Sequence, residues 1–154
     1  MTAETVPAPA LRMRLGPARP KWYRAMADLD KAASEDMDPT LAELVKIRVS
    51  QLNGCAFCLD KHTSTARAQG ESERRIYALN AWRETPFFTA RERAALSLTE
   101  AVTLITDGHV PDDVYDEAAL SLDEEELAQV LAMAITYNAW TRIGVSTRMS
   151  PPGR

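Results

Sequence analysis

The sequence predicts an all-α fold, and three observations support this prediction. From Lys21 onward the chain carries the start and stop signals of helices. No run of alternating Val, Ile or Thr is long enough to make a convincing strand. With 154 residues, 45% of them hydrophobic and 26% charged, the chain should bury a core as one domain without help from a metal or a disulfide.

Residues 1–20 are predicted to form an extended N-terminal arm ahead of a single helical domain at residues 21–148. The arm shows neither helical nor strand periodicity and holds four prolines, Pro7, Pro9, Pro17 and Pro20. We expect it to be mobile in solution or wrapped on a neighbouring subunit.

A helix over residues 41–52 is the clearest element. Asp38 and Pro39 form a good N-cap and first-turn pair, and the apolar run ends at the turn signal Asn53-Gly54. Apolar residues spread around much of its circumference, which predicts cover on more than one side. We expect this cover to come from the core, with a partner chain as a second source.

Five further helices are predicted from capping residues and turn glycines. They are a helix over about residues 55–69 ending at Gly70, a short one after Ser72, one from the capping box Thr89/Glu92 to near Gly108, a short one opened by Pro111, and a long one from the capping box Ser121/Glu124 to about Ser146.

Charge and hydropathy argue against two classes of partner. The chain has 18 basic and 22 acidic residues and no dense basic run that would neutralise phosphates, so we expect no nucleic-acid partner. No stretch approaches the roughly 18 apolar residues of a membrane span. Arginines such as Arg12 and Arg14 interrupt the N-terminal stretch that resembles a signal peptide. We therefore expect a cytoplasmic protein without a membrane partner.

The chain has two cysteines, Cys55 and Cys58. Such a pair is too small for a secreted disulfide framework, and in the cytosol it is more often catalytic or metal-binding. Helix positions i, i+3 and i+7 share one face, so both thiols should line up with His62. Residues one turn apart lie about 5 to 6 Å from each other, within the range of a disulfide. Gly54 indicates that Cys55 lies in the first turn, where the helix dipole favours a thiolate.

His62 can act as a base for these thiols, but a neutral imidazole needs a second group to fix its tautomer. Glu43 is the candidate, because a tight turn at Asn53-Gly54 would fold its helix back alongside His62. A carboxylate, an imidazole and a thiol in series form a proton relay of the kind that activates nucleophiles.

Glu43, the run Cys55-Ala56-Phe57-Cys58 and His62 together resemble the signature of the AhpD-like alkyl hydroperoxidases, within the carboxymuconolactone decarboxylase family. The resemblance covers about residues 20–148. It includes the helix over residues 41–52, the helix after the cysteines and the Asn138/Arg142 end of the last long helix.

This resemblance implies an AhpD-like helical bundle that assembles into dimers, trimers or hexamers. It implies that Cys58 attacks a hydroperoxide, that Cys55 is the resolving thiol, and that Glu43 and His62 form the relay. The implied partner is an external dithiol reductant of the lipoyl or thioredoxin type, and no bound cofactor is required.

One position departs from the family pattern. The best-characterised members have a histidine directly before the second cysteine, where this chain has Phe57. The loss of an auxiliary base implies weaker or differently directed activity and aligns the chain with the shorter, single-core branch. Members that act as carboxymuconolactone decarboxylases resemble this fold but lack the cysteine pair, so the dithiol argues against decarboxylation.

Three other uses of the cysteines are zinc binding, covalent haem attachment and a thioredoxin-like site. For zinc, Cys55, Cys58 and His62 supply three ligands, and Glu43 or the distant His109 would have to be the fourth. Covalent haem attachment requires a histidine after the second cysteine, and a thioredoxin-like site requires strands; neither is present in the sequence. The predicted function is a thiol-dependent peroxidase, and the alternative is a non-enzymatic thiol redox sensor or a zinc-stabilised interaction module.

Three tryptophans add to the expectation of an oligomer. Trp22, Trp82 and Trp140 are more often core or subunit-interface anchors than substrate-stacking residues. Together with the broadly apolar helix over residues 41–52 they predict surface that a monomer would leave exposed.

Overall fold

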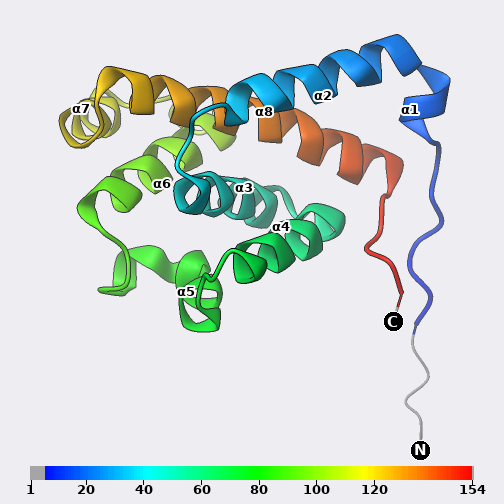
Figure 1. Ribbon diagram of the computed structural model, residues 1–154, viewed down its shortest axis with the longest axis horizontal. Coiled ribbons are helices and arrows are strands. Elements are labelled where there is room, and N and C mark those ends of the chain that lie inside the picture. The colour runs from blue at the N-terminus through cyan, green and yellow to red at the C-terminus, as the bar shows by residue number, and fades with distance from the viewer. Residues whose placement is uncertain (1–5, 154) are drawn as a thin grey trace, which may run out of the picture.

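The computed structural model describes residues 6–153, and within that range every regular element is a helix (Figure 1). The predicted all-α fold is therefore confirmed. In chain order the elements are α1 (Leu15–Ala18), α2 (Pro20–Ser34), α3 (Pro39–Asn53), α4 (Ala56–Ala68), α5 (Glu73–Ala78), the 3-10 helix η1 (Leu79–Glu84), α6 (Ala90–Thr103), α7 (Asp112–Ser121) and α8 (Glu124–Thr147). None of the described helices is both long enough and apolar enough to cross a membrane.

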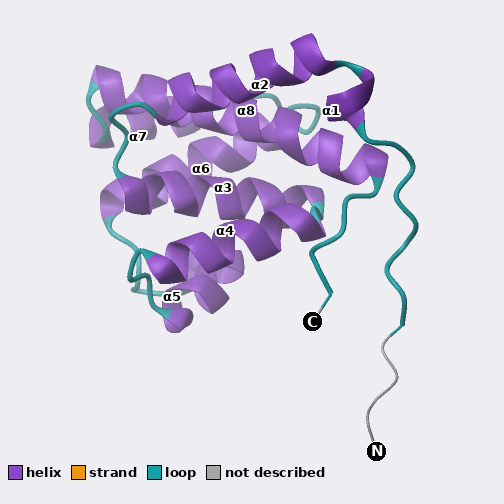
Figure 2. Ribbon diagram, turned by 45° about the vertical axis from the view of Figure 1, so that its right-hand side comes forward, coloured by secondary structure: helices purple, strands orange, loops and turns teal. Residues whose placement is uncertain are grey.

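Helix α3 is the centre of the fold and contacts α4, α6 and α8 (Figures 1 and 2). Its residues contribute to two separate apolar clusters. Val45 and Val49 belong to the cluster shared with α6, α7 and α8, whereas Leu44 and Ile47 belong to the cluster shared with α4, α5, η1 and α6. The prediction that this helix is covered on more than one side is confirmed.

The source of that cover corrects one expectation. Leu44, Val45, Ile47 and Val49 are at most 1% exposed within a single chain. The apolar circumference of α3 is therefore explained by the chain's own helices and gives no reason to invoke a partner chain. Sequence periodicity shows how many sides of a helix are apolar, but it does not show which segments cover them.

Local capping signals set the boundaries of α3 as predicted. The Asp38 carboxylate accepts a hydrogen bond from the Leu41 amide at 3.0 Å. At the other end Gly54 adopts the left-handed conformation with φ of 66°, which costs glycine little and other residues more. This C-cap turns the chain directly into α4, so that α3 and α4 pack side by side (Figure 1).

The capping box before α8 lies two residues later than predicted. Ser121 is the last residue of α7, and the box is formed by Asp123 and Glu126. Asp123 Oδ1 accepts from the Glu126 amide at 2.8 Å, and Glu126 Oε2 accepts from the Asp123 amide at 3.2 Å. Both pairs fit the same sequence pattern, and Leu122 is extended, which leaves Asp123 at the N-cap. The Thr89/Glu92 box is confirmed.

The N-terminal arm is extended over residues 6–14, but the one-turn helix α1 lies within the range predicted to be extended throughout. Residues 1–5 are outside the described part of the chain. The arm contacts the end of α8 in its own chain: the Arg12 amide donates to the Thr147 carbonyl at 2.9 Å, and the Arg12 guanidinium donates to the Ser146 carbonyl at 3.2 Å. The described part of the arm, from residue 6, and the segment that follows α8 consequently lie at the same end of the molecule (Figure 2).

A half-buried carboxylate, Glu100 on α6, links α3 to η1. It accepts from Arg48 Nε at 2.8 Å, from Trp82 Nε1 at 2.8 Å and from Arg83. Burial favours a raised pKa for Glu100, but the hydrogen bonds from Arg83, Trp82 and Arg48 outweigh it and hold the pKa below its ordinary value of 4.5.

We predict that Glu100→Gln lowers the free energy of unfolding by about 3 kcal/mol at neutral pH, because two arginines lose their shared charge partner. The folded-state pKa of Glu100 is lowered. Its ionised form therefore stabilises the fold above its ordinary pKa, and that stabilisation is lost as the pH falls through the lowered value. In acid, denaturant titrations should therefore give similar free energies of unfolding for the wild type and for Glu100→Gln.

Glu73→Gln is the matched control, because Glu73 is an exposed carboxylate paired with Arg67. It should change the free energy of unfolding much less than Glu100→Gln does, because solvent screens an exposed ion pair. Equal effects of the two substitutions would contradict the structural role of Glu100.

Candidate functional site

Cys55 and Cys58 form a disulfide with a Cα–Cα distance of 5.3 Å. Cys55 was predicted to lie in the first turn of α4, but it is the N-cap residue, one position earlier. Its Sγ accepts a hydrogen bond from the Cys58 amide at 3.3 Å. Cys58 lies in the first turn itself. Both sulfur atoms are thus at the positive end of the helix dipole, which favours negative charge on either thiol after reduction.

Glu43 and His62 meet as predicted. Glu43 Oε2 lies 3.0 Å from His62 Nδ1, and both residues are buried, at 4% and 5% exposure. An ionised carboxylate only accepts hydrogen bonds, so in the neutral imidazole Nδ1 carries the proton and Nε2 is left as the base. The structure therefore brings together Glu43 of α3 and His62 of α4, the two residues predicted to form a relay, as the tight turn at Gly54 implied.

Lys46 adds a third ionisable group that sequence reasoning missed. Its ammonium donates to Glu43 Oε1 at 3.0 Å and lies 5.2 Å from the centre of the Tyr137 ring. Burial favours a raised pKa for Glu43, but the hydrogen bonds and charges of His62 and Lys46 outweigh it and lower the pKa. Glu43 is consequently ionised at neutral pH. The i, i+3 spacing on α3 was the available signal.

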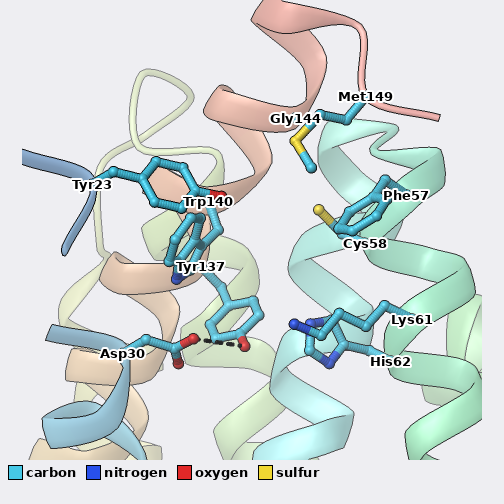
Figure 3. Close-up of a pocket in the computed structure, with 10 residues that line it drawn as sticks. All are labelled: Tyr23, Asp30, Phe57, Cys58, Lys61, His62, Tyr137, Trp140, Gly144 and Met149. Carbon is cyan, nitrogen blue, oxygen red and sulfur yellow. Dashed lines mark hydrogen bonds between the residues drawn. The ribbon is translucent and has the colours of Figure 1, made fainter. Parts of the chain in front are cut away.

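A cavity of about 160 Å³ opens beside this relay (Figure 3). Cys58 and His62 line it from one side, and residues of α2 and α8 line it from the other. Cys55 is absent from the lining residues and is 2% exposed. Of the two sulfur atoms, only that of Cys58 therefore faces the space that a substrate would occupy. Phe57, at the position of the family histidine, is also part of the wall.

Gly144 on α8 explains why Cys55 is enclosed. A Cβ atom at this position would lie 2.7 Å from Cys55 Sγ and 3.6 Å from Cys58 Sγ. The α8 backbone therefore rests directly on the disulfide. Sequence analysis did not single out Gly144, although a glycine inside a long helix costs about 1 kcal/mol relative to alanine and suggests a packing reason.

Tyr137 links the relay to the far wall of the cavity. Its ring packs edge-on against His62 with 5.0 Å between the ring centres, and its hydroxyl donates to Asp30 Oδ2 at 3.4 Å. Burial, followed by the negative charges of Asp30 and Glu43, raises the pKa of Tyr137 far above its ordinary value. Tyr137 is therefore a hydrogen-bond donor throughout the neutral range.

Asn138 fixes α8 to the end of α3 that precedes the cysteines. Its side-chain oxygen accepts from Asn53 Nδ2 at 2.9 Å and from Arg142 at 2.9 Å, and its amide nitrogen donates to Thr103 at 3.0 Å. Thr141 also accepts from Asn53 at 2.9 Å. The Asn138/Arg142 end of the last helix is thus a positioning element for the site.

The described residues supply no cluster of ligands for the zinc site that was considered as an alternative. Among the described residues, no three His, Cys, Asp or Glu side chains form a group that would hold a metal ion. His109 lies between α6 and α7 and is not part of the cavity wall.

Comparison with known proteins identifies the family. The carboxymuconolactone decarboxylase family matches residues 20–101 of this chain. The uncharacterized protein YdfG of Bacillus subtilis is 44% identical over 128 residues, which cover 82% of this chain and 87% of YdfG. The chain belongs to the carboxymuconolactone decarboxylase family.

Solved structures of similar proteins agree with the AhpD-like fold of this family member. A protein of unknown function from Agrobacterium tumefaciens, suggested to be the antioxidant defence protein AhpD, has 33% identity and a TM-score of 0.91 and covers 94% of this chain and 100% of its own. An uncharacterized peroxidase-related protein with an AhpD core from Ralstonia eutropha has a TM-score of 0.77 at 16% identity, covering 90% and 74% of the two chains. The latter supports the fold alone.

We predict that Gly144→Ala destabilises the oxidised protein by about 2 kcal/mol, because the new methyl group overlaps the Cys55 sulfur. Helix propensity alone would instead stabilise the protein by about 1 kcal/mol. Denaturant titration of the oxidised protein measures the sign directly.

A double-mutant cycle with Cys55→Ala is the control. Removal of the Cys55 sulfur makes room for the methyl group, so Gly144→Ala should then be neutral or stabilising. Destabilisation of the same size in both backgrounds would show that the cost of the methyl group arises elsewhere.

Proposed function

We propose that this family member is an enzyme, a thiol-dependent peroxidase that reduces hydroperoxides through Cys55 and Cys58. The observation that carries this proposal is the cavity shared by Cys58 and His62, with Glu43 bonded to the opposite edge of the imidazole. A thiol, its base and the group that orients the base are in series, and space for a substrate lies beside the thiol.

In the reduced enzyme, His62 Nε2 accepts the Cys58 proton, and Glu43 stabilises the resulting imidazolium through Nδ1. The Cys58 thiolate then attacks one peroxide oxygen. A sulfur–oxygen bond forms and the oxygen–oxygen bond breaks, so that Cys58 is oxidised to a sulfenic acid and the hydroperoxide is reduced. The leaving alkoxide takes the proton from His62 and departs as an alcohol.

The second step closes the disulfide. The Cys55 thiolate attacks Cys58 Sγ, the sulfur–oxygen bond breaks, and the hydroxide leaves as water after it takes up a proton. An external dithiol of the lipoyl or thioredoxin type then attacks Cys58, whose sulfur is the one that lines the cavity, and forms a mixed disulfide with it. Cys55 leaves as a thiolate, stabilised by the hydrogen bond from the Cys58 amide. The second thiol of the reductant breaks the mixed disulfide, which closes the reductant's own disulfide and releases the Cys58 thiolate.

The alternative is a non-enzymatic thiol redox sensor, which would use the same disulfide without turnover. A sensor does not require a substrate cavity at the attacking sulfur, so the cavity favours the enzyme. Decarboxylation, the activity after which the family is called, gives no role to the dithiol. Phe57 places an apolar ring in the cavity wall, and we propose that it directs the enzyme toward organic rather than small polar hydroperoxides.

Assembly into a homo-oligomer remains part of the proposal, although α3 no longer supports it. The described surface exposes apolar side chains on α7 and α8 that an interface would cover, such as Leu120 at 89% and Ile135 at 58%. Of the three tryptophans, Trp82 is a core residue at 4% exposure, and Trp22 is exposed at 44%.

Substitution of either cysteine should stop peroxide turnover, but at a different step for each. Cys58→Ser removes the attacking thiol, so peroxide consumption with a dithiol reductant should fall to the uncatalysed background. Cys55→Ser should still react once and accumulate a sulfenic acid on Cys58, which dimedone traps and mass spectrometry detects. A Cys55→Ser protein that forms no sulfenic acid, beside a Cys58→Ser protein that does, would reverse the assignment.

The relay predicts non-additive losses. Glu43→Gln and His62→Ala should each move the midpoint of Cys58 alkylation to higher pH and lower peroxide reduction roughly 10²-fold, because each removes support for the thiolate. The double variant should lose little more than the worse single variant. These profiles are measured in the Cys55→Ser background, where Cys58 is the single thiol.

Asp60→Asn is the matched control, since Asp60 is an exposed carboxylate on α4 that is not part of the cavity wall. It should keep the wild-type profile. If the relay variants also keep that profile while folded, His62 is a bystander and the relay is wrong.

A further inference from the structure

The wall of the cavity opposite the relay carries an unusual polar pair. Asp30 from α2 and Trp140 from α8 both line the cavity, and neither takes part in the proposed relay. In Figure 3 the indole nitrogen of Trp140 is on the edge of the ring that faces Asp30, across the cavity from Cys58.

Trp140 Nε1 is a buried donor that has no hydrogen-bond acceptor among the described residues. The ring itself is held firmly, because Tyr23 packs edge-on against it with 5.3 Å between ring centres. Indole N–H groups usually find a partner when they are buried, since an unpaired buried donor costs about 1 to 3 kcal/mol. A ligand acceptor at this position would recover that cost.

Asp30 offers acceptor capacity to the same space. Its carboxylate accepts from the Tyr137 hydroxyl at 3.4 Å and from the Ser34 hydroxyl at 3.5 Å, and both contacts are long. An ionised carboxylate accepts about four hydrogen bonds, so Asp30 is able to bind a further donor. The aromatic rings of Tyr23, Tyr137 and Trp140 surround this end of the cavity.

A hydroxyl group satisfies both residues at once, because it accepts from the Trp140 N–H and donates to the Asp30 carboxylate. An ammonium group would pair with Asp30 but has no acceptor for Trp140. A carboxylate would accept from Trp140 but would be repelled by Asp30, although Lys61 elsewhere in the wall offsets part of that repulsion.

We propose that the cavity selects organic hydroperoxides that carry a second, alcoholic or phenolic hydroxyl group away from the peroxide. Asp30 and Trp140 hold that hydroxyl, the aromatic rings hold the carbon skeleton, and the peroxide is presented to Cys58. This substrate class rests on the proposed peroxidase function, but its binding part does not require turnover.

Binding is tested first, on the oxidised protein, with unreactive product alcohols. Para-hydroxycumyl alcohol should bind about tenfold more tightly than cumyl alcohol by calorimetry. Trp140→Phe, which keeps an aromatic ring, and Asp30→Asn should each abolish that advantage. Asp28→Asn, an exposed aspartate on the same helix, should keep it.

The three indole N–H signals of isotope-labelled protein supply a readout that a merely structural role would not move. Para-hydroxycumyl alcohol should shift the Trp140 signal, which the Trp140→Phe variant assigns. The signals of Trp82, already bonded to Glu100, and of the exposed Trp22 should stay in place.

Turnover is tested second, with cumene hydroperoxide and its para-hydroxy analogue. Wild type should favour the hydroxylated substrate in kcat/KM about tenfold. Trp140→Phe and Asp30→Asn should each lose this preference, whereas Asp28→Asn should keep both the preference and the wild-type activity. Equal binding of both alcohols, or preference for para-carboxycumyl alcohol, would overturn the inference. Selective binding without peroxide reduction would instead contradict the proposed peroxidase and leave the binding assignment intact.

Discussion

The buried hydrogen bond between Glu43 and His62 is the interaction on which the site depends. Two ionisable side chains are removed from water here, which is unfavourable unless each is paired and held. Lys46 supplies the compensating charge, and the hydrogen bond fixes which imidazole nitrogen remains free. The bond exists only because α3 and α4 pack side by side after the left-handed turn at Gly54.

Rigidity of α3 makes that pairing reproducible. Two apolar clusters pack against different sides of α3, and Arg48 of α3 donates a hydrogen bond to Glu100 on α6. At its end, Asn53 is bonded to Asn138 and Thr141 of α8. The apolar clusters, the contact of Arg48 with α6 and the contacts of Asn53 with α8 therefore hold α3 in place. A preorganised site requires such support for its carboxylate, its imidazole and its disulfide.

The two cysteines are chemically alike but lie in unlike surroundings. The α8 backbone at Gly144 closes over Cys55, whereas Cys58 faces the cavity and shares it with His62. A difference in access, rather than in local sequence, therefore separates the proposed attacking thiol from the resolving thiol. In the proposed reaction a peroxide would meet Cys58 first, and Cys55 would react with the product of that encounter.

Sequence reasoning succeeded mainly where the determinant was local. The caps of α3, the i, i+3, i+7 face that includes His62, and the return of Glu43 across a tight turn all follow from spacings along neighbouring segments. It failed where two patterns competed, as with Ser121 and Asp123, and where the partner was distant in sequence. Periodicity showed that α3 is covered but not that the cover comes from its own chain.

Apart from Lys46, whose i, i+3 spacing from Glu43 was visible, the site residues that sequence reasoning missed share one physical origin. Asp30, Tyr137, Trp140 and Gly144 come from α2 and α8, which meet the cysteine helix only through tertiary packing, and no spacing along the chain links them to Cys58.

This distribution separates the chemistry from the cavity wall. The relay and the thiols lie on α3 and α4, inside the residues 20–101 that the family matches, whereas α8 begins at Glu124, beyond that match. Helix α8 contributes Tyr137, Trp140 and Gly144 to the wall. A substitution at Trp140 of α8 can therefore change what the cavity accepts without touching Glu43 or His62, whereas Tyr137 contacts His62 directly. The wall supplied by α8 is accordingly where we expect specificity to be set, while α3 and α4 keep the chemistry constant.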